Sequence, residues 1–194
     1  FFYKKQQAEQ AAQLAAQNLA ALARADSPTF GNPSAPVHIV EFFDPLCGTC
    51  RDFYPLVKAM MLANPDKIRL SLRYAPFHPG SQDVVKVLEA SRKQGKFEAT
   101  LEALFASQDT WVQNHRANLQ LVGPALAPLG MDLERLQLDA TAPEVANIIA
   151  RDLQDAKTMN VTMTPEYFVN GKPLPQFGFA ELQGLVNEAL ANAK

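Results

Sequence analysis

Three segments of the chain carry the hydrophobic pattern of β-strands. Val37–Phe43 is an almost continuous apolar run, which predicts a buried strand. Polar and apolar side chains alternate over Lys67–Tyr74, and this period predicts a second strand. Glu166–Gly171 predicts a third strand, which ends in an Asn-Gly turn.

Helical periodicity fills most of the remaining chain. A helix is expected from Gly48 to about Leu62, between the first two strands, and another closes the chain at 179–191. From about 80 to 157 the pattern is helical, with a break at Gly95 between the first two helices of this block. Further helices of the block are expected at 119–129, 133–138 and 143–157. Strands and helices in this order predict an α/β fold.

Residues 1–27 differ from the rest of the chain because they are rich in Ala and Gln and contain no Gly. Good helix formers predict a single helix from about Lys4 to Ala25. Its apolar positions fall near coiled-coil spacing, although the seam is short. A solvated helix of this length is marginal alone, so we expect it to pack on a second copy of itself or on the domain. Self-association is the first interpretation.

The composition is that of an ordinary globular protein. At 194 residues the chain can bury a core without a disulfide framework or a structural metal. The formal net charge of -2 argues against a nucleic-acid partner, which usually requires a basic stripe. No run of about 18 apolar residues is present that would span a bilayer. Phe1–Tyr3, followed by two lysines, has the composition of the water-side end of a membrane anchor; a frayed helix start is the alternative.

The candidate chemistry lies in the segment Cys47-Gly48-Thr49-Cys50, which holds the only two cysteines of the chain. It follows the first predicted strand and opens the next helix. A thiol at a helix N-terminus is close to unpaired N–H groups and the positive end of the dipole, which favour the thiolate. We expect Cys47 to be exposed and to attack, and Cys50, one turn further in, to resolve the mixed disulfide.

Two other interpretations of the cysteines are a zinc half-site and a structural cystine. Zinc needs about four ligands, and no second cysteine pair or closely spaced histidine pair exists. His38, His78 and His115 are scattered singly, and His78 is the one that could lie near the motif. We therefore expect neither a metal nor another cofactor. The cysteine count alone does not fix the cellular compartment.

Two separated motifs resemble the bacterial DsbA/DsbC/DsbG family of thiol–disulfide oxidoreductases. The first is Phe43–Cys50 and the second is Val161–Gly171; the stretch at 94–108 resembles the helical insertion of such proteins. The resemblance begins at about Pro28 and implies a thioredoxin-like fold with an all-helical insertion. It divides the chain into an N-terminal helical segment at 1–27 and a catalytic domain at 28–194, with the insertion at about 80–157.

The resemblance also implies roles for residues outside the dithiol. The Thr164–Pro165 bond would be cis and face the dithiol, which leaves the Thr164 backbone to pair with an extended substrate. Glu41 lies where DsbA-like proteins carry a buried acid, and it would accept protons from Cys50. The alternative for Glu41 is a structural acid paired with Lys67, Arg69 or Arg73, among which the sequence does not decide.

Gly48-Thr49 replaces the histidine-containing dipeptide of strongly oxidising DsbA proteins and supplies no cation to the Cys47 thiolate. This predicts a less depressed pKa for Cys47 and a less oxidising disulfide. The first functional interpretation is a periplasmic or otherwise extracytoplasmic disulfide isomerase or reductase. It would act on protein substrates with a membrane redox partner, as a homo-oligomer through residues 1–27, and an anchor before Phe1 is one possibility. A DsbA-like oxidase is the close alternative, and a copper-tolerance or thiol-client binding protein is the third.

Overall fold

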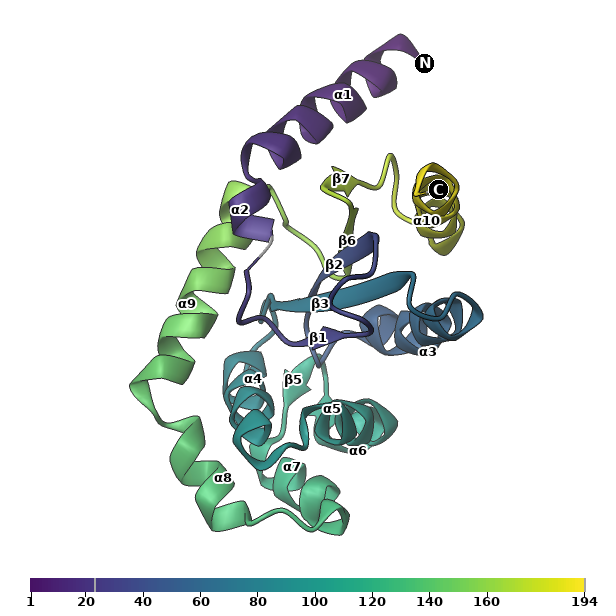
Figure 1. Ribbon diagram of the computed structural model, residues 1–194. Coiled ribbons are helices and arrows are strands. Elements are labelled where there is room, and N and C mark those ends of the chain that lie inside the picture. The colour runs from purple at the N-terminus through teal and green to yellow at the C-terminus, as the bar shows by residue number, and fades with distance from the viewer. Residues whose placement is uncertain (23, 194) are drawn as a thin grey trace. The chain divides into compact units, whose positions relative to one another are not determined.

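The computed structural model describes residues 1–22 and 24–193, which form two compact units (Figure 1). The first unit comprises Phe1–Phe42, Asp52–Arg73 and Asp155–Lys194. The second comprises Phe43–Arg51 and Tyr74–Gln154. The chain therefore passes from one unit to the other within strands and helices. The division predicted from the resemblance, with a boundary after residue 27, stays a prediction.

A five-stranded sheet with the order β1-β3-β2-β6-β7 is the centre of the first unit. The three predicted strands are confirmed, with two short strands added at the edges: β1 Thr29–Phe30, β2 Val37–Phe43, β3 Ile68–Tyr74, β6 Glu166–Val169 and β7 Lys172–Pro173. β1 and β7 have two residues each, which is too short for a periodic signal. Their pairing with β3 and β6 is antiparallel.

The expected Asn-Gly turn joins β6 to β7. Asn170 and Gly171 have φ values of 48° and 83°, the left-handed conformations that a two-residue hairpin turn requires. On its other side β6 pairs with β2 in antiparallel register, so that Glu41 lies opposite Tyr167. Both strands are buried along almost their whole length.

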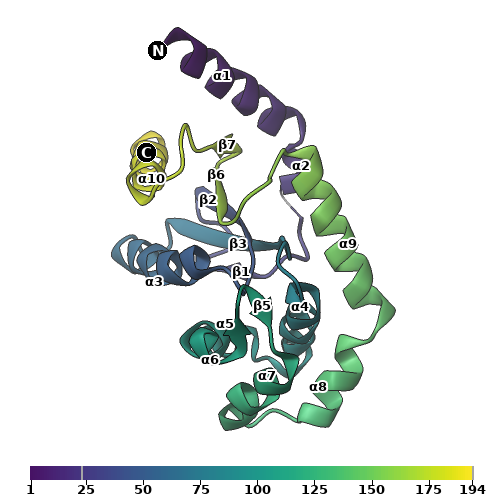
Figure 2. The same cartoon turned by 180° about the vertical axis from the view of Figure 1, so that it is seen from behind.

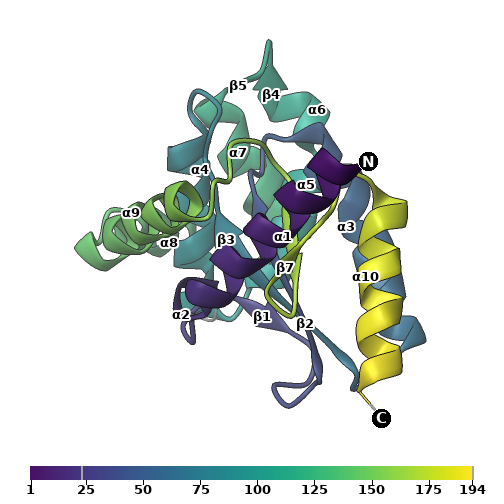
Figure 3. The same ribbon diagram turned by 90° about the horizontal axis from the view of Figure 1, so that it is seen from above.

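The prediction of one continuous N-terminal helix is wrong. Helix α1 covers Phe2–Gln17, and a separate turn, α2, covers Leu19–Leu22. The break falls at Asn18, whose side-chain amide and backbone N–H both donate to the carbonyl of Leu14. The Asn18 side chain thus competes with the backbone for a helical carbonyl. The prediction missed this break because the surrounding residues are good helix formers. Within the unit, α1 lies against β7 (Figure 3).

Two further helices belong wholly or mostly to the first unit. Helix α3, Gly48–Ala63, starts in the second unit and continues in the first, and α10 covers Phe179–Asn192. Both were expected from the hydrophobic pattern. Pro55 is accommodated inside α3.

The second unit is built mainly of helices (Figure 2). Its α-helices are α4 Ser81–Ala90, α5 Phe97–Ala106, α6 Gln108–Trp111, α7 Leu119–Leu126, α8 Leu133–Ala140 and α9 Pro143–Thr158, whose last turn belongs to the first unit. Two 3₁₀ turns, Ser91–Gln94 and Ala127–Leu129, extend α4 and α7. The break at Gly95 is confirmed, with a φ of 67°. The sequence pattern missed α6 and a small hairpin, β4 Val112–Gln113 and β5 Arg116–Ala117.

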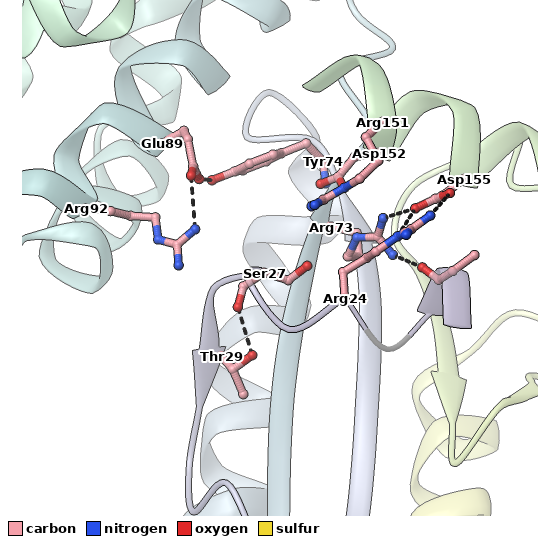
Figure 4. A network of polar contacts seen from close by, with 11 residues as sticks. Arg24, Ser27, Thr29, Arg73, Tyr74, Glu89, Arg92, Arg151, Asp152 and Asp155 are labelled. Carbon is pink, nitrogen blue, oxygen red and sulfur yellow. Dashed lines mark hydrogen bonds and ion pairs between the residues drawn. The ribbon is translucent and has the colours of Figure 1, made fainter. Parts of the chain in front are cut away.

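Each unit also contains a buried polar cluster (Figure 4). In the first unit the carboxylate of Asp155 accepts two bonds from Arg24, at 2.9 Å each, and one from the fully buried Arg73. Arg73 also donates to the carbonyl of Ala21, so the segment after α1 is fixed to the sheet and to the end of α9. These partners lie as many as 131 residues apart in the chain.

The buried cluster of the second unit has Tyr74 at its centre. Its hydroxyl donates to Glu89, which also accepts a bond of 3.0 Å from Arg92. Its backbone N–H donates to Asp152 at 3.0 Å. Burial raises the pKa of Glu89, and the hydrogen bonds from Tyr74 and Arg92 only partly oppose this effect.

Candidate active site

The dithiol lies where the second unit passes from strand to helix. Cys47 ends the loop after β2, α3 begins at Gly48, and Cys50 is in the first turn of the helix. The backbone N–H of Cys50 donates to the sulfur of Cys47 at 3.2 Å. The expected three-residue spacing therefore brings the sulfur of the first cysteine to the backbone N–H of the second, in the first turn of the helix.

The exposure expected for Cys47 is wrong in degree. Its relative exposure is 8% and that of Cys50 is 0%, so the order is as predicted but Cys47 is buried. Within the loop, the Cys47 N–H donates to the carbonyl of Asp44 at 2.9 Å. On the other side of Cys47, its carbonyl accepts a bond of 3.1 Å from the side chain of Gln108.

Electrostatic stabilisation of a Cys47 thiolate comes from the helix terminus. The N–H contact from Cys50 and the positive end of the α3 dipole both favour negative charge on the Cys47 sulfur. Gly48 and Thr49 are half-buried and carry no charge. The motif itself therefore adds no cation, as the sequence predicts.

Three polar side chains near the dithiol were missed or left undecided by the sequence. Asp44 is fully buried and accepts a bond of 2.9 Å from the Leu46 N–H within the loop. His78, whose position the sequence left open, contacts the Asp44 carboxylate through Nδ1 at 2.7 Å. Gln108 lies 61 residues from Cys47 in the chain, so no local pattern links them.

The Thr164–Pro165 peptide bond is cis, as the resemblance implied. It belongs to the first unit and directly precedes β6. Pro165 is buried and Thr164 is half-buried, whereas the preceding Met163 is 75% exposed. The expectation that this bond faces the dithiol stays a prediction.

Glu41 is a buried acid in the middle of β2, as the sequence predicts, and it is 2% exposed. The hydroxyl of Tyr167 on the neighbouring strand donates to it at 3.3 Å. Of the basic partners considered, Arg69 donates to the carbonyl of Ala35 and Arg73 binds Asp155. The sequence did not predict the tyrosine, because the β2–β6 register brings it there from 126 residues away.

Aromatic rings connect Tyr167 to the surface of the first unit. Phe53 on α3 stacks between Tyr167, at a centroid distance of 6.1 Å, and Phe177, at 5.4 Å. Phe179 packs edge-on against the same ring at 5.8 Å. Phe177 is 57% exposed, so the stack ends in an apolar side chain at the surface. Aromatic pairs of this kind stabilise the packing by about 0.5–1.5 kcal/mol each.

Two titratable groups of the sheet have strongly shifted pKa values. Burial raises the pKa of Glu166, the residue after the cis-proline, to about 7. Burial and the charge of Arg69 lower the pKa of His38 to about 4, and its Nε2 lies 2.7 Å from the Ser71 hydroxyl. Within the described residues, no group of three or more His, Cys, Asp or Glu side chains is arranged to hold a metal ion.

The sheet order, the dithiol at the start of the helix after β2 and the cis-proline before β6 define a protein of the thioredoxin fold. The chain belongs to the thioredoxin family, because residues 23–188 match the family model described as thioredoxin. The relationship expected from the resemblance to DsbA-like proteins is confirmed as membership of this family. Across residues 1–22 and 24–193, no helix is both long enough and apolar enough to cross a membrane.

Solved structures share this fold over almost the whole chain. A thioredoxin-like oxidoreductase from Silicibacter pomeroyi DSS-3 is 33% identical, has a TM-score of 0.77, and the match covers 90% of this chain and 98% of that one. BdbD from Bacillus subtilis is 24% identical with a TM-score of 0.73, covering 85% and 93%. The catalytic domain of Proteus mirabilis ScsC is 19% identical with a TM-score of 0.75, covering 93% and 98%. The last two similarities concern the fold.

The curated relatives are longer proteins. The chain is 31% identical over 149 residues to the Na⁺/H⁺ antiporter NhaA 1 of Mycobacterium sp. (strain KMS). This match covers 73% of this chain and 23% of that protein. The NhaA antiporter of Herminiimonas arsenicoxydans is also 31% identical, over 144 residues that make up 22% of its length. The chain thus spans about a quarter of the length of these relatives, and their name describes the longer protein.

Proposed function

We propose that the protein is an extracytoplasmic thiol–disulfide oxidoreductase that acts on protein substrates through Cys47 and Cys50. The observation that carries the proposal is the 3.2 Å contact from the Cys50 N–H to the Cys47 sulfur at the start of α3. It stabilises the thiolate, the reactive form in disulfide exchange. The family and the 33% identical oxidoreductase of the same fold support this assignment.

The exchange needs two steps. The Cys47 thiolate attacks a substrate disulfide, an S–S bond forms as the substrate bond breaks, and the departing substrate sulfur takes up a proton. The Cys50 thiol then loses its proton and attacks the Cys47 sulfur, which releases the second substrate thiol and leaves a Cys47–Cys50 disulfide. The substrate gains two electrons and the dithiol loses two. We assign the proton of Cys50 to Glu41, with the hydroxyl of Tyr167 holding that carboxylate.

The isomerase or reductase direction is our first choice. The dipeptide Gly48-Thr49 adds no positive charge, so the Cys47 thiolate and the reduced dithiol are less stabilised than with a histidine, and the disulfide is a weaker oxidant. In isomerisation a substrate thiol resolves the mixed disulfide and Cys47 is regenerated without net oxidation. The oxidase alternative differs in its redox partner at the membrane and in the resting state of the dithiol.

Substrate binding is assigned to the cis-proline segment of the first unit. The backbone of Thr164 would pair with an extended substrate strand beside Pro165. The exposed side chains of Met163 and Phe177 supply apolar surface on this unit, which fits an unfolded or misfolded polypeptide as substrate.

Self-association through residues 1–27 stays part of the proposal. Helix α1 contacts β7 of its own chain, so docking accounts for one of its faces. At its start Phe1, Phe2 and Tyr3 are 107%, 81% and 70% exposed, a concentration of apolar surface that a second copy would cover. Light scattering of the full chain measures the number of copies, and a monomer at all concentrations would remove this part of the proposal.

Cysteine variants of the full chain separate the reactions. Cys47→Ala is expected to abolish reactivation of a scrambled-disulfide enzyme, whereas Cys50→Ala keeps part of it, because isomerisation can turn over through Cys47 alone. Rapid oxidation of a fully reduced substrate, without reactivation of the scrambled one, would instead identify an oxidase. A protein that takes up Cu(I) stoichiometrically on its two thiolates, with no exchange, would favour the binding-protein alternative.

A further inference from the structure

The carboxylate of Asp44 accepts four hydrogen bonds and contacts a histidine ring, although it lies outside the Cys-x-x-Cys motif. Oδ1 accepts the Leu46 N–H at 2.9 Å and the hydroxyl of Ser81. Oδ2 accepts the backbone N–H groups of Phe77 and His78, at 2.8 and 3.1 Å, and lies 2.7 Å from Nδ1 of His78. A carboxylate has about four lone-pair sites, so all of its acceptor capacity is used.

These bonds connect two loops of the second unit. One is the loop of Asp44–Cys47, which leads from β2 into α3, and the other is the loop of Phe77–Ser81, which leads into α4. Each oxygen of Asp44 bonds a backbone N–H, Oδ1 in its own loop and Oδ2 in the second loop. Asp44 is 0% exposed, so water does not substitute for these donors.

Gln108 holds the same loop from the start of α6. Its side-chain amide donates to the carbonyls of Pro45, at 2.8 Å, and Cys47, at 3.1 Å, and the side chain is 3% exposed. The Cys47 N–H donates in turn to the carbonyl of Asp44 at 2.9 Å. Both backbone polar groups of Cys47 are thus fixed by named partners.

We propose that Asp44 is a positioning residue for thiol–disulfide exchange, because it fixes the loop that holds the Cys47 sulfur against the Cys50 N–H. The inference rests on the proposed function, since it concerns the same dithiol. Asp44 does not touch the substrate in this scheme. Its contribution is the geometry that allows one helix-terminal N–H to stabilise the thiolate.

Position and charge predict opposite effects, which makes the proposal testable. If Asp44 acted mainly through its negative charge, its neutralisation would favour the nearby thiolate and lower the pKa of Cys47. If it acts by positioning, neutralisation loosens the loop, weakens the 3.2 Å contact to the sulfur and raises the pKa of Cys47. In Asp44→Asn the new NH₂ group would face either the Leu46 N–H or the N–H groups of Phe77 and His78, so bonds to a loop break in both orientations while the side-chain volume stays the same.

The experiment titrates Cys47 in the reduced full chain, by thiolate absorbance and by the pH dependence of alkylation with iodoacetamide. Asp44→Asn is expected to raise the pKa of Cys47 by about one unit, which slows alkylation about tenfold below that pKa. Asp83→Asn, an exposed carboxylate in the first turn of α4, is the matched control and should leave both readouts unchanged. An unchanged or lowered pKa in Asp44→Asn, with a native circular dichroism spectrum, would overturn the proposal.

Two milder variants keep the proposal testable if Asp44→Asn does not fold. Ser81→Ala removes one donor and keeps the carboxylate, and Gln108→Ala removes the two bonds to the loop without changing any charge. Both are expected to raise the pKa of Cys47, by less than the Asp44 variant, and no change in either would refute the role of loop position. These titrations need no substrate, so they stay separate from the proposed function, which would fail if the wild-type chain exchanged no disulfides.

Discussion

Replacing Asp155 with alanine removes the centre of the buried cluster in the first unit (Figure 4). The Asp155 side chain is 8% exposed and that of Arg73 is 0% exposed, so the variant takes away a carboxylate that binds a buried guanidinium. Breaking a buried pair in this way costs about 3–5 kcal/mol of unfolding free energy. Arg24 is 34% exposed and its contact adds about 0–1 kcal/mol. We expect Asp155→Ala to destabilise the protein by about 3–5 kcal/mol at neutral pH.

The loss should depend on pH in a defined direction. Burial acts to raise the pKa of Asp155, but hydrogen bonds from Arg24 and Arg73 and their charges outweigh it, so the pKa is lowered from 3.8. A carboxylate with a lowered pKa stabilises the folded state above its unfolded pKa and loses this contribution as the pH falls through its folded pKa. The difference between wild type and variant should therefore be full at neutral pH and shrink in acid.

Urea unfolding followed by circular dichroism, at about pH 7 and about pH 3, measures both effects. Asp109→Ala is the control, because Asp109 is 97% exposed and its ion pair with Arg51 lies at the surface, so the variant should change the midpoint little. The double variant Asp155→Ala/Arg73→Met also removes the buried guanidinium that has lost Asp155, and it should recover part of the stability. A loss below about 1 kcal/mol for Asp155→Ala at neutral pH would mean that the cluster contributes no more than a surface ion pair, and would refute the reasoning.

Three further predictions concern single side chains that are buried or half-buried. Glu166→Gln should be more stable than wild type at about pH 8 but not at about pH 4. The pKa of Glu166 in the folded state is raised from 4.5 to about 7. The wild-type protein therefore loses about 1–2 kcal/mol of stability, after solvent screening, as the pH rises through this window. Equal urea midpoints of the two proteins at both pH values would contradict this. Tyr74→Phe should cost about 1–3 kcal/mol because it removes a buried donor to Glu89, and thermal unfolding checks it. Leu88→Ala, at a fully buried position of α4, should cost about 2–5 kcal/mol; a midpoint within error of wild type would show that the cavity collapses.

The features that the sequence predicted correctly depend on neighbours in the chain. The strand at Val37–Phe43 and the helix at Gly48 are each recognised from a few consecutive side chains, whose periodicity shows which face is buried. The dithiol is equally local, because three residues on a helix set the relation between Cys47 and Cys50. The cis bond at Thr164–Pro165 came from a resemblance, which transfers information that no period carries.

The features that were missed depend on partners far away in sequence or on very short elements. Asn18 ends α1 through one side-chain bond, which helix propensities averaged over many residues do not detect. The pairs Arg24–Asp155 and Glu41–Tyr167 join residues 131 and 126 positions apart, and only the sheet register and the packing of α9 bring them together. Charge type alone gave Glu41 three basic candidates and did not suggest the hydroxyl of Tyr167, which the strand register brings to it.

Asp44 illustrates how the two kinds of information combine at the site. Its place three residues before Cys47 is visible in the sequence, but an acid in a loop is usually solvated and gives no sign of a role. The fold buries it completely and surrounds it with five polar groups, four of them from a loop more than 30 residues away. A buried carboxylate destabilises the fold unless its acceptor sites are hydrogen-bonded, since each missing bond would cost about 1–3 kcal/mol. The loop that presents Cys47 is therefore held by long-range contacts, while the reactivity of the thiol comes from the local start of α3.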